Sequence, residues 1–197
     1  MTKKDLIFID FVKKECKKHG VKCELRPRKY LVLDGNVKCG GYFDGENKKL
    51  VVAMNNLEAF PILVHEYCHL TQWLDNSPYW VDADVSIAKL FDWLSGKKIH
   101  KIQKHIDIVR NLELDNEKRA VKIIKKFDLS INIDEYTKKA NAYVLFYNWL
   151  YYTRRWSKPG KAPYSNKLVL NEMSTKFNMR YNTLSKKVYN AFLLSEI

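Results

Sequence analysis

Residues 62–73 read Ile-Leu-Val-His-Glu-Tyr-Cys-His-Leu-Thr-Gln-Trp, and this stretch carries the strongest structural signal in the chain. His65 and His69 stand four positions apart, so on an α-helix their imidazoles project from one face. The other face is apolar and would anchor the helix in a core; it carries Leu63, Val64, Tyr67, Leu70 and Leu74. The stretch therefore predicts a helix over about residues 57–74 that presents two histidines on one side.

The patterns on either side of this helix predict an α+β fold in a single domain, residues 1–197. An amphipathic helix is expected over residues 5–18. Short β-favouring runs follow at residues 21–25, 30–33, 41–43 and 50–54. Turn signals such as Asp34-Gly35-Asn36 separate them and predict a small, largely antiparallel sheet. Beyond residue 78 the chain should be helical, at residues 82–94, about 99–127 and about 134–156, with shorter pieces after residue 166.

The charge of the chain is strongly positive and unevenly distributed. Its 35 lysines and arginines exceed its 22 acidic residues by a net charge of +13. Between Tyr30 and Trp93, however, four basic residues face nine acidic ones. A basic envelope favours nonspecific binding of nucleic acid, and a solvated lysine-rich surface is the alternative. No nucleic-acid-binding motif of fixed spacing occurs.

The remaining bulk features predict a cytoplasmic protein with no membrane partner. The N-terminal residues lack the apolar run of a secretory signal, and no stretch reaches the roughly 18 apolar residues of a membrane span. Four cysteines, Cys16, Cys23, Cys39 and Cys68, match no zinc-ribbon or disulfide-scaffold spacing. We expect free thiols, and a metal shared by the first three is the alternative.

The helix at residues 57–74 places a carboxylate beside the two histidines. Imidazoles four apart can bind one metal ion, and Glu66 lies one step around the helix from His65, where it can reach a water at the metal as a general base. Two histidines and a carboxylate on an apolar helix carry a desolvation cost that a metal would offset. The alternative is two hydrogen-bonded core histidines and a surface glutamate.

A catalytic zinc ion, Zn²⁺, needs a third protein ligand and an open position. On the helix predicted around residues 109–124, Glu113 falls within the inward arc and Glu117 at its edge, whereas Asp115 faces outward. Glu113 is therefore the expected third ligand, and Glu117 the acceptor that orients a ligand histidine. The reverse assignment stays open, as does a three-histidine site that uses His100 or His105.

Hydrolysis would also need a hydrogen-bond donor for the oxyanion. Tyr143 and Tyr147 lie four apart on one face of the helix expected at residues 134–156. Tyr143 is the candidate catalytic donor, and a purely structural aromatic stripe is the alternative. Arg154 and Arg155 could bind a phosphate or a carboxylate, or could complement the helix dipole.

The motif resembles the gluzincin branch of zinc peptidases, which includes the thermolysin-like enzymes. Glu113-x-x-x-Glu117 is similar to their Glu-x-x-x-Asp, with glutamate in place of the final aspartate. The chain also resembles small metallopeptidases attributed to bacteriophages, in stretches around residues 65–73, 112–121 and 141–156. In gluzincins the strand before the motif helix lies at the sheet edge and pairs with an extended substrate, so Lys49–Met54 would be that strand. From the residues alone an ordinary core strand is the favoured description, because the sequence does not show which strand is the edge.

Together these features predict a zincin-like, zinc-dependent peptidase that acts on a peptide or protein substrate. Zinc would polarise the scissile carbonyl and activate a water, while Glu66 would take the water proton and pass it to the leaving amine. Two other classes stay open. One is a basic nucleic-acid-associated protein whose zinc site is structural or serves to trim DNA-bound proteins, and the other is a noncatalytic interaction protein that keeps a metal for folding.

Overall fold

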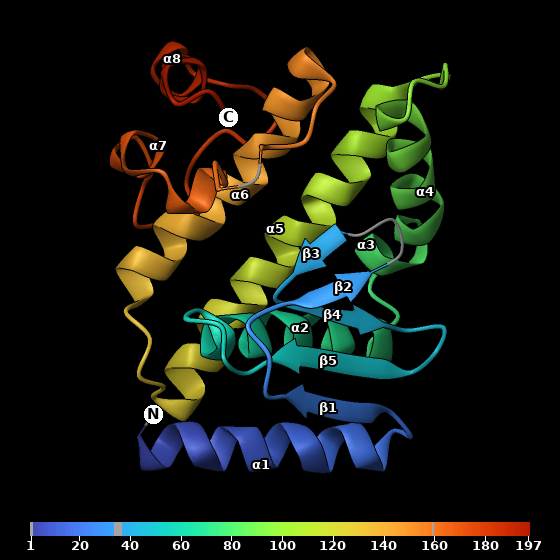
Figure 1. The fold of residues 1–197 in the computed structure, drawn as a ribbon, viewed down its shortest axis with the longest axis vertical. Coiled ribbons are helices and arrows are strands. Elements are labelled where there is room, and N and C mark those ends of the chain that lie inside the picture. The colour runs from blue at the N-terminus through green and yellow to red at the C-terminus, as the bar shows by residue number, and fades with distance from the viewer. Residues whose placement is uncertain (1, 34–36, 159) are drawn as a thin grey trace. The chain divides into compact units, whose positions relative to one another are not determined.

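The computed structural model describes residues 2–33, 37–158 and 160–197, which form an α+β fold with many helices and a small mixed sheet (Figure 1). Its β-strands are β1 (Lys22–Arg26), β2 (Leu31–Leu33), β3 (Val37–Cys39), β4 (Gly41–Asp44) and β5 (Lys49–Ala53). Its longer helices are α1 (Lys3–Lys18), α2 (Ala59–Leu74), α4 (Ala83–Leu94), α5 (Ile102–Phe127), α6 (Ile133–Thr153) and α8 (Lys186–Leu194). Its short helical segments are α3 (Pro78–Val81), η2 (Pro163–Ser165) and α7 (Lys167–Asn171).

The chain divides into two compact units. The first unit comprises Met1–Ser77 with Arg119–Ile131, and the second comprises Pro78–Lys118 with Asn132–Ile197. Helix α5 contributes to both, since the division falls within it, after Lys118. The expectation of a single domain over residues 1–197 stays a prediction.

A three-stranded sheet in the order β1-β5-β4 forms the centre of the first unit. Strand β5 pairs in parallel with β1 and antiparallel with β4, and β2 pairs antiparallel with β3 in a separate two-stranded sheet. The prediction of a largely antiparallel sheet therefore missed one parallel pairing. That pairing joins strands that are distant in sequence, and the alternation within each strand does not encode its partner. The predicted turn at residues 34–36 lies outside the described residues.

The position of β5 decides between the two descriptions of the strand before the motif helix. Strand β5 has a hydrogen-bonded neighbour on both sides, so it is not the edge strand that the resemblance implies. Its residues Leu50–Ala53 are fully buried, which confirms the favoured description as an ordinary core strand. Among the described strands, β4 is the edge that borders β5 on the side away from β1.

Helices α1 and α2 pack against this sheet through an aromatic core. Helix α1 lies along β1, and α2 packs on β4 and β5 (Figure 1). Phe8 of α1 meets Tyr67 of α2 edge-on at 5.7 Å between ring centroids, and it also meets Phe127 at the end of α5 at 5.1 Å. Such edge-to-face contacts add stability beyond their buried area. This core holds α2 by the apolar face that its sequence predicted, since Leu63, Val64 and Leu70 are also fully buried.

A buried carboxylate fastens the start of α1. Thr2 and Asp5 form a reciprocal capping box, which satisfies backbone donors that the first helical turn leaves without partners. Asp5 also accepts hydrogen bonds from the backbone N–H and the hydroxyl of Ser130, in the segment that follows α5. Burial raises the pKa of Asp5, but these hydrogen bonds outweigh it and hold that pKa below its ordinary value.

The second unit is helical, and α6 is buried around its whole circumference from Val144 to Leu150. Its core takes large apolar residues from several helices, among them Leu90, Ile106, Leu145, Phe146 and Phe192. Two buried asparagines of α6 hold the irregular segment that precedes α8. Asn141 donates to the carbonyl oxygens of Ser174 and Lys176, and Asn148 donates to that of Tyr181 at 2.8 Å. Buried side-chain amides with such partners fix a loop that lacks the regular backbone hydrogen bonds of a helix or a sheet.

The predicted helices match α1, α2, α4, α5 and α6 to within a few residues at their ends. Strand β3 was missed, because three residues are too short to show a period of two. None of the helices in the described part of the chain has both the length and the apolar character needed to cross a bilayer.

Candidate metal centre

Helix α2 brings the two histidines of the motif together as the sequence predicted. The Nε2 atoms of His65 and His69 lie 3.2 Å apart, and their rings meet edge-on with centroids separated by 4.7 Å. Two nitrogen ligands at about 2.0–2.1 Å from one tetrahedral zinc ion would lie about 3.3 Å apart. The imidazole pair therefore has the separation that such an ion requires. A hydrogen bond between the two rings has a similar length, so the distance alone fits either state.

Gln72 fixes one of these rings, a contact that the sequence analysis missed. The amide oxygen of Gln72 accepts from Nδ1 of His69 at 2.9 Å, and both side chains are buried. An N–H at Nδ1 leaves Nε2 unprotonated, and an unprotonated imidazole nitrogen is the form that binds a metal. The signal was available, because residues three apart on a helix are neighbours. A glutamine side-chain oxygen can accept from a ligand histidine as a carboxylate does.

Glu66 lies on the side of α2 that faces the β3–β4 turn. Its side chain is 8% exposed, and a Cβ added to Gly41 of β4 would lie 3.2 Å from its Cγ. That added Cβ would also lie 2.6 Å from Ile62 Cγ2, so glycine at the start of β4 allows the helix to approach this closely. Burial and then the charge of Glu66 raise the pKa of the nearby Cys39 thiol. Glu66 is therefore a buried carboxylate directly next to His65 in sequence, one step around α2.

The inward face of α5 carries both candidate glutamates, as predicted. Its apolar and amide members are buried: Val109, Leu112, Asn116, Ala120 and Ile124. Glu113 and Glu117 are buried with them, at 8% and 5% exposure. Within the second unit, the hydroxyl of Tyr136 donates to Glu117 at 2.6 Å. Gln72, and not Glu117, is therefore the hydrogen-bond partner of His69 at Nδ1. The predicted role of Glu117 as the acceptor for a ligand histidine can now concern only His65, and for His65 it stays a prediction.

The predicted tyrosine pair of α6 lies beside Glu113 within the second unit. The hydroxyl oxygens of Tyr143 and Tyr147 are 3.1 Å apart, and their rings meet edge-on at 5.6 Å. Burial first, and the negative charge of Glu113 next, raise the pKa of both phenols well above the ordinary value. Both tyrosines therefore keep their protons and can serve as hydrogen-bond donors at neutral pH.

The other candidate residues have structural surroundings. His105 pairs through Nδ1 with the Ser86 hydroxyl at 3.2 Å, and His100 is exposed in the turn before α5. Arg154 ends α6 in the left-handed conformation and donates to the carbonyl oxygens of Trp93 and Lys97. Its guanidinium therefore joins the ends of α6 and α4. Among the described residues, Cys16, Cys23 and Cys39 do not come together as a metal-binding group.

Comparisons of the chain with family models, with curated proteins and with solved structures gave no match.

Proposed function

We propose that the chain is a zincin-like, zinc-dependent peptidase whose metal is held by His65, His69 and Glu113. The observation that carries the proposal is the imidazole pair of α2 taken together with Gln72. The Nε2 atoms are 3.2 Å apart, as two ligands of one tetrahedral ion would be, and Gln72 accepts at Nδ1 of His69. The buried contact from Gln72 supports it, because that contact keeps the lone pair of His69 directed at the ion. Two nitrogens and one carboxylate oxygen form a donor set typical of catalytic zinc.

The choice of Glu113 rests on the donor chemistry and on the continuity of α5. His65, His69 and Glu113 are the described residues that could together hold a metal ion. Arg119, on the same unbroken helix as Glu113, donates to Thr71 at 3.2 Å and to Asp75 of the segment after α2 at 2.6 Å. Glu113 precedes Arg119 by six residues, or about 9 Å of helix. Glu117 already accepts a hydrogen bond from Tyr136, which suits an orienting role better than ligation.

When bound, zinc would polarise the scissile carbonyl and make the attacking water more acidic. Glu66 takes the proton of that water and delivers it to the leaving amine, which its position next to His65 permits. Tyr143 donates to the oxyanion, with Tyr147 as its hydrogen-bonded neighbour, since both phenols stay protonated.

Strand β4 is the element proposed to hold the substrate. It pairs with β5 on one side and packs on α2 on its face, next to Glu66. An extended peptide can add to such an edge through main-chain hydrogen bonds, which give affinity without strong sequence preference. We therefore expect cleavage of extended, unfolded segments of peptides or proteins.

Metal analysis of the purified full-length protein tests the proposal. We expect about one equivalent of zinc, and we expect hydrolysis of an unfolded protein such as casein to stop with a chelator and return with zinc. His65→Ala should lose the metal, whereas His100→Ala, an exposed histidine, should keep it. Less than about half an equivalent of zinc, with no gain of activity on adding metal, would overturn the proposal.

Variants of α5 test the third ligand. Glu113→Ala should lower zinc affinity far more than Glu117→Ala, because ligand loss exceeds the roughly 10- to 100-fold cost of losing an orienting partner. Asp115→Ala is the control on the same helix. If Glu117→Ala lost the metal and Glu113→Ala kept it, the two roles would be reversed.

A further inference from the structure

The turn between α1 and β1 brings two thiols together. The backbone N–H of Val21 donates to the carbonyl oxygen of Cys16 at 2.8 Å, so β1 begins against the last turn of α1. Side chains alternate along a strand, and Cys23 therefore faces the same side as the buried Val21. On that side the Cys16 and Cys23 thiols are close enough for each to shift the pKa of the other. Both cysteines are free thiols in this structure.

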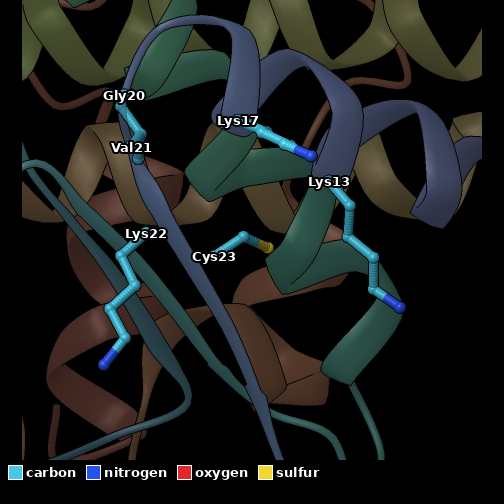
Figure 2. A pocket seen from close by; sticks show the side chains of 6 residues that line it. All are labelled: Lys13, Lys17, Gly20, Val21, Lys22 and Cys23. Atoms are coloured by element: carbon cyan, nitrogen blue, oxygen red, sulfur yellow. The ribbon is translucent and has the colours of Figure 1, made fainter.

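The two thiols differ in access and in charge. Cys16 is fully buried, whereas Cys23 is partly exposed and lines a hollow of about 450 Å³. Figure 2 shows the Cys23 sulfur on the same side of β1 as Lys13 and Lys17, which project from α1. A hydrogen bond donated by Cys16 and then the charge of Lys13 lower the pKa of the Cys23 thiol, against its burial and the charge of Glu24. The pKa of Cys16 is raised, first because it donates this bond and next because it is buried.

We propose that Cys16 and Cys23 form a peroxide-reactive dithiol, in which Cys23 is the attacking thiolate and Cys16 the thiol that resolves it. The hollow beside Cys23 admits a small hydroperoxide, and Lys13 and Lys17 supply the positive surroundings in which a cysteine reacts as thiolate. Cys16 is fully buried, so it cannot meet the oxidant first. This site is separate from the proposed zinc centre and does not depend on it.

The reaction balances in two steps. The Cys23 thiolate attacks the hydroperoxide, an S–O bond forms as the O–O bond breaks, and water or an alcohol leaves with a proton. Cys16 then attacks the sulfenic sulfur, the S–S bond forms as the S–O bond breaks, and the Cys16 proton leaves with the oxygen as water. The protein loses two electrons and two protons, and the peroxide takes up both. A dithiol reductant would reverse the change.

Peptide mapping of the reduced, folded full-length protein after a brief exposure to hydrogen peroxide tests this assignment. We expect an intramolecular Cys16–Cys23 disulfide to form first, with the loss of two titratable thiols. The Cys39→Ser and Cys68→Ser variants should form it at the wild-type rate. First oxidation at Cys39 or Cys68, or disulfides between molecules instead, would overturn the proposal; this measurement needs no variant at the dithiol itself.

Variants then assign the two roles. Cys16→Ser should stop at a Cys23 sulfenic acid that dimedone traps, whereas Cys23→Ser should leave Cys16 unmodified. Lys13→Gln should slow disulfide formation roughly two- to fivefold, because less Cys23 is thiolate, and Lys14→Gln is the matched control on the same helix. Oxidation of Cys16 in Cys23→Ser at the wild-type rate would contradict the assigned order, as would equal rates in the two lysine variants.

Discussion

The histidine pair of α2 and the tyrosine pair of α6 use the same spacing for different chemistry. Each places two rings four residues apart, meeting edge-on, with polar atoms 3.2 Å apart in one pair and 3.1 Å in the other. Gln72 holds a proton on the far side of His69 and leaves a lone pair at the centre. Burial and the charge of Glu113 keep the protons on Tyr143 and Tyr147. One pair therefore suits a cation and the other an anion.

The comparison teaches that the helical repeat decides which side chains meet, whereas their surroundings decide what they do. A glutamine three residues on makes one pair a candidate metal ligand, and a buried carboxylate makes the other a candidate donor. Four substitutions test this contrast.

Glu66→Gln should have the largest effect. If the α2 pair serves hydrolysis, loss of the general base should lower kcat about 10²- to 10⁴-fold, with zinc content and fold retained. Glu58→Gln, an exposed glutamate just before α2, is the matched control. Kinetics on an unfolded protein substrate and metal analysis measure both. Full activity in Glu66→Gln would leave the α2 pair as a structural metal site at most.

Gln72→Leu tests the histidine pair of α2. It removes the acceptor for Nδ1 of His69 and should weaken zinc binding roughly 10- to 100-fold. Gln72→Glu keeps an acceptor oxygen and should bind zinc close to wild type or more tightly. Competition with a chromophoric chelator measures the affinity, and Gln103→Leu is the control. Equal affinities in the Leu and Glu variants would show that Gln72 does not orient the ring.

Tyr143→Phe tests the tyrosine side. Removal of one oxyanion donor with a hydrogen-bonded neighbour still in place should lower kcat about tenfold and leave the zinc content unchanged. Tyr152→Phe, an exposed tyrosine of the same helix, should have wild-type kinetics. If Tyr147→Phe is impaired and Tyr143→Phe is not, the donor is Tyr147. If both are active, the pair belongs to the core alone.

Asp5→Asn should have the smallest effect, and it isolates the balance between burial and hydrogen bonding. For Asp5 hydrogen bonds outweigh burial, so its pKa is lower in the folded than in the unfolded chain. Its ionised form therefore stabilises the fold above the unfolded pKa of about 4, and this contribution is lost as pH falls through the folded pKa. Asp5→Asn should lower the free energy of unfolding by about 1 kcal/mol at pH 7 and by less at pH 3.

Urea unfolding at both pH values measures this difference, with Asp10→Asn, an exposed aspartate of α1, as the control. A destabilisation that is equal at pH 3 and pH 7 would mean that ionisation of the Asp5 side chain adds nothing to the free energy of unfolding.

Local sequence patterns predicted the longer helices up to α6 and one part of the candidate centre, its histidine pair. Helices α1, α2, α4, α5 and α6 have apolar repeats long enough to show their period, and the His65–His69 pair follows from one helix alone. The parallel partner of β5 and its central place in the sheet were not readable, because strand pairing joins segments that are far apart in sequence. The approach of Cys16 and Cys23 was missed for a different reason: their spacing matches no motif, and only the turn from α1 to β1 brings them together.

By itself, the sequence determined which side chains share a face: the two histidines and Glu66 on α2, the two buried glutamates on α5, and the tyrosines on α6. The physical reason is that a helix of 3.6 residues per turn sets these directions through covalent geometry and backbone hydrogen bonds. Tertiary structure decided what surrounds these side chains. For example, it brings Gly41 next to Glu66, and it places the Tyr136 hydroxyl where it donates to Glu117. Protonation depends on burial and on neighbours from other elements, and only folding brings those neighbours together.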